Sequence, residues 1–255
     1  MYIKYMKYMK YILPIFILIL FIIIYLKVIL KKSSSIISLG IPCIPKHTKH
    51  LDELIDNVNN QELLPYEIII SLSETNANDG KQLEDKLNKL SKVNVKIIAS
   101  EKKQYAGENR NVCSKNCNTK IISFIDSDDL ICNSRIKILE DVYKKYNYDV
   151  LFHSYSNNIS KCSNNYKKIY DRNETKKQYK KNNNTNKNDS VYLDLNLTHG
   201  HVTIKTEILN KYPIDVKGYG EDTRYLHTLF ENDLNVIGLP DYIGSIYRQE
   251  NSSWK

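Results

Sequence analysis

The chain has 255 residues and a formal net charge of +8, with 26% charged and 42% hydrophobic side chains. This length suits one sizeable domain after an N-terminal segment is set aside. Basic charge alone would suit nucleic acid, but the sequence carries no zinc-finger spacing, helix-turn-helix signal or aromatic RNA-binding pattern, so we expect no nucleic-acid partner.

The N-terminal residues have the pattern of a membrane anchor. Residues 11–26 (YILPIFILILFIIIYL) carry no charge, and an apolar stretch of about 20 residues can span a bilayer while Lys27 reaches the interface. No small-residue cleavage site follows, so we predict that residues 1–32 form an uncleaved tail and transmembrane signal anchor, rather than a removed signal peptide or a buried helix. Residues 33–255 then form one domain, and we expect a single-pass type II protein with this domain in a lumenal compartment. Lysines flank both ends of the stretch, so charge hardly distinguishes the two orientations.

The first half of the domain alternates strands and helices. Residues 36–41 (IISLGI) form an apolar run that ends at Pro42, as buried parallel strands do. Residues 49–61 carry apolar side chains at helical spacing. Further strands are predicted at 66–72, 93–99 and 121–125, further helices at 83–90 and 108–118, and a polar loop closed by Asp79-Gly80 after the second strand.

The second half is less regular. Residues 156–190 are rich in Lys and Asn with few aliphatic side chains, which is typical of a long mobile loop or insertion. Around this segment we predict helices at 135–146 and from 221 onward, and strands at 150–153, 191–197, 201–204 and 235–239.

This order of elements predicts an α/β fold with a mostly parallel sheet and helices on both faces. In such sheets ligands bind beyond the carboxyl ends of the strands. Polar loops at 43–50, 73–80 and 126–129 fall at those ends.

The stretch IISFIDSDDL at 121–130 ends a buried strand with three carboxylates, Asp126, Asp128 and Asp129. Like charges this close repel one another, and burying them is costly unless something compensates. A cation would compensate. The alternative, an aspartate that caps the helix at 135–146, explains one of the three acids and leaves two unexplained.

The cysteines give no framework of their own. Five cysteines, an odd number without compact spacing, do not predict a disulfide scaffold. Cys113 and Cys117 are close in sequence, but no second Cys/His pair follows at zinc spacing. We therefore expect most of the cysteines to be small buried hydrophobic residues.

From about Ser35 to Trp254 the sequence resembles the GT-A glycosyltransferases of the family 2 type. The resemblance rests on IISLGIPCIP, on EIII, on the triplet Asn109-Arg110-Asn111 followed by IISFIDSDD, on GYGEDTRYL, and on Tyr247-Arg248. It implies a Rossmann-like GT-A fold and a metal-dependent enzyme that moves one sugar from a nucleotide-sugar to a hydroxyl of a glycan, protein or lipid. The tail lacks Q-x-x-R-W, so we expect a non-processive reaction, and the resemblance implies inversion.

The resemblance also implies a donor site with a divalent cation, Mn²⁺ or Mg²⁺, both of which prefer carboxylate oxygens. Asp128 is then the direct metal ligand, and Asp126 contacts the ribose or the metal through water, while Asp129 orients its neighbours or caps the next helix. Arg110 holds the pyrophosphate or the acids, unless it is a surface arginine. The family's aspartate after the second strand is missing, so Ser73 or Glu74 takes its role, and UDP is the default nucleotide. The residues expected to contact the nucleotide-sugar are Pro42, Ser73, Glu74, Asn109, Arg110, Asp126 and Ser127.

The acceptor hydroxyl needs a base, and Glu221-Asp222 open a helix whose dipole keeps them ionised. By the family pattern Asp222 is the expected base and Glu221 the substitute, unless both cap the helix. Gly220 would allow close approach to substrate. His199 and His201, on the acceptor side, bind the acceptor or the nucleotide phosphate, or are ordinary loop histidines.

Two other functions fit the same fold. One is a non-catalytic protein that keeps the fold and binds nucleotide-sugar or glycan. The other is a sugar-phosphate nucleotidylyltransferase, which typically has a Gly-rich loop with Arg and Lys after the first strand. This chain has PCIPKH there, so the second alternative is weaker.

Overall fold

A computed structural model describes residues 35–176, 201–215 and 221–251, all within one unit that spans Ser35–Lys255. The predicted anchor at 1–32 and the predicted strand at 191–197 lie outside the described residues. Within the described ranges, no helix is long and apolar enough to cross a bilayer.

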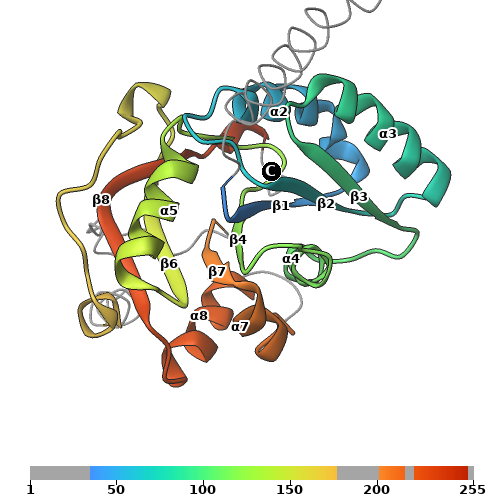
Figure 1. Ribbon diagram of the computed structural model, residues 1–255. Coiled ribbons are helices and arrows are strands. Elements are labelled where there is room, and N and C mark those ends of the chain that lie inside the picture. Colours follow the sequence, from blue (N-terminus) through green and yellow to red (C-terminus); the bar gives the residue numbers. More distant parts are fainter. Residues whose placement is uncertain (1–34, 177–200, 216–220, 252–255) are drawn as a thin grey trace, which may run out of the picture. The chain divides into compact units, whose positions relative to one another are not determined.

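The strands form one eight-stranded sheet with the order β3-β2-β1-β4-β7-β6-β8-β5 (Figure 1). The strands are β1 (Ile37–Cys43), β2 (Glu67–Ser73), β3 (Asn94–Ser100), β4 (Ile121–Phe124), β5 (Leu130–Ile131), β6 (Val150–Ser156), β7 (Thr203–Lys205) and β8 (Val236–Ile246). The α-helices are α2 (Leu51–Asn59), α3 (Ala77–Leu90), α4 (Ala106–Lys115), α5 (Arg135–Tyr146), α7 (Thr206–Lys211) and α8 (Glu221–Glu231). Three short 3₁₀ helices are η1 (Pro45–His50), η2 (Ile159–Lys161) and η3 (Gln249–Asn251).

The sheet is mixed, which corrects the expectation of a mostly parallel sheet. Strands β1 to β4 run parallel to their neighbours in the block β3-β2-β1-β4, and β6 is parallel to β8. Strand β7 is antiparallel to both β4 and β6, and β5 is antiparallel to β8. The parallel block places the ends of β1, β2 and β4 at one edge, where ligands bind in open α/β sheets.

Helices cover both faces of the sheet because successive strand residues point to opposite sides. Ile68 and Ile70 pack with apolar residues of α2 and α3, whereas Ile69 packs on the other face with Cys113 of α4 and with residues of α8. Figure 1 shows α2 and α3 on one side of β1 to β3, and α4 on the opposite side. The near-continuous apolar strands of the sequence are therefore buried on both faces.

Helix α3 begins earlier than the sequence pattern predicts. The predicted polar loop up to Gly80 contains the first turn of this helix, because the Asn76 side chain accepts a hydrogen bond from the Asp79 amide at 2.9 Å and caps it. Gly80 lies inside the helix, where an added Cβ would be 2.6 Å from the Cβ of Ala99. A close contact with β3, not a turn, accounts for this glycine.

The described part of the Lys/Asn-rich segment, residues 157–176, packs on the sheet, which corrects the expectation of a mobile loop there. Tyr170 and Gly238 exchange backbone hydrogen bonds of 2.8 and 2.9 Å. The Asp241 carboxylate accepts backbone hydrogen bonds from Lys167 and Lys168 at 2.9 and 3.2 Å. Residues 177–190 lie outside the described part.

Two cysteines depart from the expectation of buried thiols. Cys132 and Cys162 form a disulfide across 30 residues of sequence. Cys43 and Cys113 are buried thiols, as expected, and Cys117 is a partly buried thiol. Spacing in the sequence gave no sign of this pair, because a single long-range disulfide needs no repeating pattern.

Candidate functional site

The acidic loop, residues 126–129, follows β4 at the point where the order of the parallel strands reverses, beside β1. Its Asp126 side chain is 30% exposed, while Asp128 and Asp129 are buried. The alternative of a helix cap is wrong for these acids, because α5 begins after Ser134 and the structure shows no side-chain cap at that residue.

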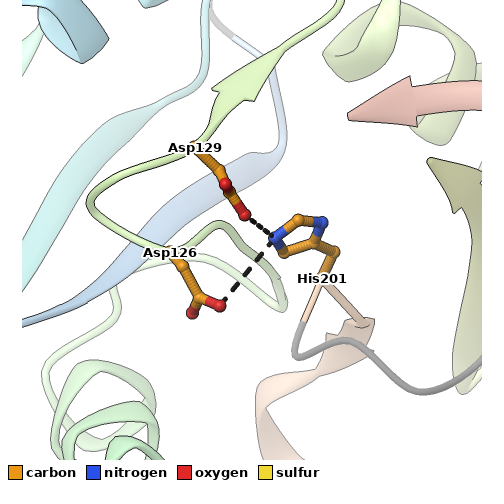
Figure 2. Close-up of side chains that lie close together, drawn as sticks. All are labelled: Asp126, Asp129 and His201. Atoms are coloured by element: carbon orange, nitrogen blue, oxygen red, sulfur yellow. Dashed lines mark ion pairs between the residues drawn. The ribbon is translucent and has the colours of Figure 1, made fainter. Parts of the chain in front are cut away.

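His201, just before β7, lies against this loop (Figure 2). Its Nε2 atom is 3.0 Å from Asp129 Oδ2 and 4.0 Å from Asp126 Oδ2. One ligand atom from each of these three side chains lies within 4.8 Å of the others. We call Asp126, Asp129 and His201 the candidate metal group.

The chemistry of the candidate metal group fits a divalent cation. Carboxylate oxygens suit Mg²⁺ and Mn²⁺, and imidazole favours transition metals. Asp129 is 1% exposed, and its Oδ2 atom accepts no hydrogen bond of acceptable geometry from the described residues. The same Oδ2 atom lies 3.0 Å from His201 Nε2, and a cation bound by these two side chains would offset the cost of burying the carboxylate. His201 was expected on the acceptor side, and the structure instead brings it to the acidic loop.

Asp128, the expected direct ligand, faces η1. Its Oδ2 atom is 3.7 Å from His47 Nδ1. Burial, followed by the charges of Asp126 and Asp129, raises the pKa of the Asp128 carboxyl to about 7. Burial, followed by the charges of His50 and Lys46, lowers the pKa of His47. A cation near the acids would oppose this rise in the pKa of Asp128. That Asp128 is a metal ligand stays a prediction.

Arg110 of α4 connects the two predicted halves of the site. Its Nη2 atom lies 2.6 Å from Asp126 Oδ1, and its Nη1 atom lies 3.5 Å from Glu221 Oε1. The Arg110 side chain is 5% exposed, so the alternative of a surface arginine is wrong. The structure thus brings together three residues that the sequence spread over more than 100 positions.

Glu221, the first residue of α8, is also held by the start of α4. The Gly107 amide donates a hydrogen bond to Glu221 Oε1 at 2.5 Å. An added Cβ at Gly107 would lie 2.4 Å from Ile214 Cγ2 and 3.2 Å from Glu221 Cδ. Sequence reasoning missed Gly107, although its place at a helix start beside NRN was a possible signal. The Asp222 side chain, Gly220 and His199 lie outside the described part.

The expected nucleotide side of the site lies at the ends of β1 and β2. Pro42 and Ser73 are buried at these strand ends, and Ser127 is 2% exposed. Glu74 is exposed and has a φ of 56°, a conformation that non-glycine residues seldom adopt. Asn109 is buried, which places it beneath the site rather than on its surface.

Asn109 has a defined set of contacts there. Its Oδ1 atom accepts a hydrogen bond from the Ser71 hydroxyl at 2.7 Å, and its Nδ2 atom lies 3.5 Å from Ser73 Oγ. A side chain larger than alanine at this position therefore joins α4 to the end of β2. Its contact with a nucleotide-sugar stays a prediction.

Arg248 holds the acidic loop in place, and Arg135 holds the strands around it. The Arg248 amide donates to Asp129 Oδ1 at 2.8 Å, its Nε atom to the Asp128 carbonyl at 2.5 Å, and its Nη1 atom to Glu53 Oε2 at 2.5 Å. Arg135 is fully buried behind the loop, and burial lowers its pKa to about 10.

The Arg135 guanidinium contacts neutral oxygens on several strands. It donates to the Phe124 carbonyl at 2.6 Å and to the His201 carbonyl at 3.3 Å. It also donates to the hydroxyls of Ser123 and Ser245, each at 2.9 Å. These bonds join β4 and β8 to the residue that precedes β7, directly behind the candidate metal group.

Comparison with known families gives a match over most of the domain. The model of Glycosyl transferase family 2 matches residues 38–204, well over half of the 255 residues. No curated protein sequence matches the chain at a significant level.

Solved structures share the fold. S. aureus TarS 1–349 in complex with UDP-GlcNAc aligns with a TM-score of 0.61 at 17% identity, over 83% of this chain and 58% of that one. The mannosyltransferase PcManGT from Pyrobaculum calidifontis in complex with GDP-Man and Mn²⁺ aligns with a TM-score of 0.54 at 12% identity, over 83% of this chain and 56% of that one. The chain therefore spans less than two thirds of the length of either structure.

Proposed function

Because this chain belongs to glycosyl transferase family 2, it is a glycosyltransferase, and we propose that it moves a single sugar from a nucleotide-sugar to an acceptor hydroxyl in a metal-dependent, inverting and non-processive reaction. The observation that carries the proposal is the position of Arg110. This buried guanidinium lies between Asp126 of the acidic loop and Glu221 of α8. Residues expected on the donor side and on the acceptor side therefore belong to one continuous site.

On the donor side, Asp126, Asp129 and His201 would hold a divalent cation, with Asp128 beside them. When bound, such a cation would neutralise charge on the diphosphate leaving group. Arg110 would add a fixed positive charge, and its planar guanidinium suits phosphate oxygens as well as carboxylates. Buried charges of this kind act strongly because little water screens them.

On the acceptor side, we assign the general base to Asp222 and a positioning role to Glu221. Glu221 Oε1 already accepts a hydrogen bond from Gly107 and lies near Arg110, and both contacts favour its ionised form. A carboxylate held in this way is a weak base. The neighbouring residue in the first turn of α8 is then the better candidate to accept the proton of the acceptor hydroxyl.

The nature of the substrates follows from the same chemistry. We propose a UDP-sugar as donor and a glycan, protein or lipid as acceptor. The TarS structure contains UDP-GlcNAc, and the Pyrobaculum mannosyltransferase structure contains GDP-Man and Mn²⁺. These complexes support a nucleoside diphosphate sugar as the class of donor.

We further propose that residues 1–32 anchor the protein in a membrane as a single-pass type II protein with the domain in a lumenal compartment. The apolar stretch at 11–26 supports the anchor. The Cys132–Cys162 disulfide supports the lumenal side, because disulfides persist in oxidising compartments.

Calorimetry on the 255-residue chain in detergent tests the function. We would titrate a panel of nucleotide-sugars and bare nucleotides in the presence of Mn²⁺ and again with EDTA. The expected result is binding of one nucleotide-sugar that EDTA abolishes. Failure of every nucleotide-sugar to bind the folded protein would refute the proposal and favour a non-catalytic protein with this fold.

Three variants then assign the cation ligands. Asp128→Ala tests the ligand expected from the sequence, and Asp129→Ala tests the residue that the structure adds. Asp141→Ala is the matched control, because its side chain is 46% exposed in a surface ion pair with Lys137. Loss of Mn²⁺-dependent binding in the first or second variant, but not in the control, identifies the ligand.

A further inference from the structure

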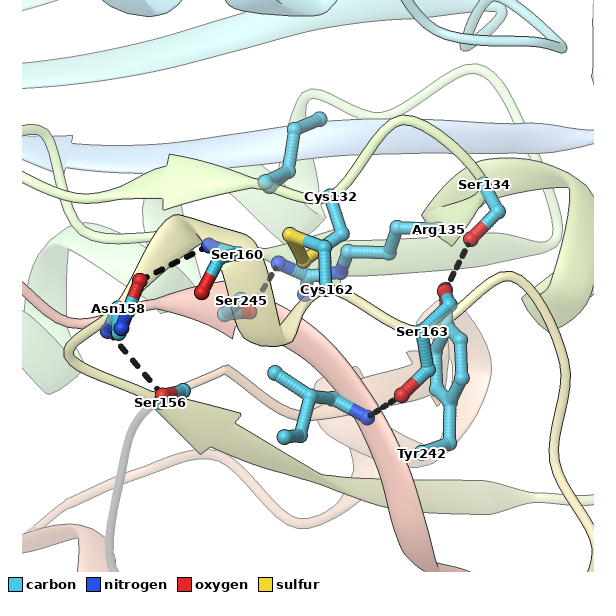
Figure 3. Close-up of a disulfide and its surroundings, with 12 residues drawn as sticks. Cys132, Ser134, Arg135, Ser156, Asn158, Ser160, Cys162, Ser163, Tyr242 and Ser245 are labelled. Carbon is cyan, nitrogen blue, oxygen red and sulfur yellow. Dashed lines mark hydrogen bonds between the residues drawn. A yellow bond between two sulfur atoms is a disulfide. The ribbon is translucent and has the colours of Figure 1, made fainter.

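A disulfide joins the end of the acidic loop to a distant part of the chain (Figure 3). Cys132 directly follows β5, three residues after Asp129, and Cys162 follows η2. Cys132 is 1% exposed, and Cys162 is partly exposed. The disulfide therefore connects the residues that follow the acidic loop to the segment 157–176, which packs on the sheet at β8.

Both ends of the disulfide are also fixed by hydrogen bonds. The Cys132 amide donates to the Gly244 carbonyl at 3.0 Å, and the Cys132 carbonyl accepts from Gln61 Nε2 at 3.0 Å. On the other side, the Ser163 amide donates to the Ile243 carbonyl at 3.2 Å. Because the backbone around each cysteine is held by hydrogen bonds, the disulfide limits how far the two segments can move apart.

The Cys162 side has a second contact with the start of α5. The Ser134 hydroxyl donates to the Ser163 carbonyl at 2.7 Å and lies 3.1 Å from the Tyr242 hydroxyl, a contact that Figure 3 shows. The segment around Cys162 is therefore held against the same turn that leads from the acidic loop into α5. Covalent and non-covalent contacts restrain the same few residues.

At this end the acidic loop leads into a short strand. Strand β5 has two residues, which pair with Ser245 and Ile246 at the edge of the sheet. Isolated two-residue ladders at a sheet edge contribute little stability. The Arg248 amide adds one hydrogen bond to Asp129. Arg248 Nε also donates to the Asp128 carbonyl, and the Ile131 amide donates to Asn57 Oδ1. The covalent bond three residues beyond Asp129 adds a restraint to these hydrogen bonds at the end of the short strand.

We propose that the Cys132–Cys162 disulfide positions Asp129 for cation binding, so that the donor site depends on the redox state of this pair. The inference rests on the proposed function, because it concerns the same cation. Reduction by a dithiol would transfer two electrons and two protons to the disulfide and give two cysteine thiols, while the dithiol closes to its own disulfide. The backbone after Asp129 would then relax, and the candidate metal group would lose its spacing.

The test compares Mn²⁺ binding by the 255-residue chain in detergent with and without the disulfide. The variant is Cys132→Ser/Cys162→Ser, and the matched control is Cys117→Ser, which removes a free thiol. Changes to groups that orient metal ligands typically weaken binding by about 10- to 100-fold, and we expect a loss of this size in the double variant alone. Circular dichroism should show an unchanged fold in all three proteins.

Each outcome has a clear meaning. Equal Mn²⁺ affinity in the wild type and the folded double variant would overturn the inference. If the double variant does not fold, the wild type is reduced with a dithiol, its new thiols are counted, and Mn²⁺ affinity is measured again. Unchanged affinity, or loss of the whole fold on reduction, would also overturn it. A wild type that binds no Mn²⁺ would instead refute the metal dependence in the proposed function, and with it this inference.

Discussion

Replacing Arg110 with glutamine should remove most of the transfer activity. Arg110 Nη2 is 2.6 Å from Asp126, which is 30% exposed, so water would replace part of that bond. The Glu221 contact is longer, 3.5 Å, but the two side chains are 5% and 10% exposed. A hydrogen bond to a charged group contributes about 1.5–3 kcal/mol, and these two imperfect contacts together give about 2–4 kcal/mol. Because about 1.4 kcal/mol is a factor of ten, kcat/KM should fall by about 30- to 1000-fold.

Steady-state transfer to a soluble acceptor measures this effect, with thermal melting to confirm the fold. Arg110→Lys keeps the charge but loses the planar fork, so we expect an intermediate loss of about tenfold. Arg172→Gln is the matched control, because Arg172 pairs with an Asp233 side chain that is fully exposed. Such surface pairs contribute little, and kcat/KM should not change. Full activity in folded Arg110→Gln would refute the role of Arg110 as the link between the two sides.

Gly107→Ala should lower the free energy of unfolding by about 1–3 kcal/mol, because the new methyl group would lie 2.4 Å from Ile214. Thermal melting measures this loss, and a melting temperature equal to that of the wild type would contradict the close packing at Gly107. Asp222→Asn should leave donor affinity in calorimetry unchanged but abolish transfer, and retained turnover would move the base to Glu221 or elsewhere. Asp128→Asn should stabilise the metal-free protein more at pH 8 than at pH 5, as measured by urea unfolding. The folded pKa of about 7 exceeds the ordinary aspartate value of 3.8, so the folded state holds the extra proton and its stability falls as pH rises between these values. The gain at pH 8 should be at most about 4 kcal/mol, and an equal effect at both pH values would show that the Asp128 pKa is not raised.

Local patterns in the sequence were sufficient to predict the strands that carry the site. The runs IISLGI, EIIISL and IISFI form β1, β2 and β4, because continuous apolar residues suit strands buried on both faces. The crowding of three acids after the last of these runs identified the acidic loop. Helix α5 was predicted at 135–146 and has these bounds, since its apolar spacing is regular.

Contacts between distant residues were not predictable in the same way. His201 meets Asp129 only because β7 pairs antiparallel with β4, and a three-residue strand has too little pattern to reveal its partner. The hydrogen bond between Gly107 and Glu221 spans 114 residues, and the disulfide spans 30. Such pairings depend on tertiary packing, which the sequence of a single chain does not display locally.

Arg135 has a consequence for which residues around this site the fold can replace. It donates to neutral oxygens of Phe124, Ser123, Ser245 and His201, while its charge attracts Asp126 and Asp129 from behind. Part of the repulsion among the acids is thus offset by a residue that belongs to the framework. The fold should therefore tolerate a single substitution in the acidic loop better than a substitution of Arg135. Arg135 has no such freedom, because removing it would leave several buried oxygens and a cluster of acids uncompensated together.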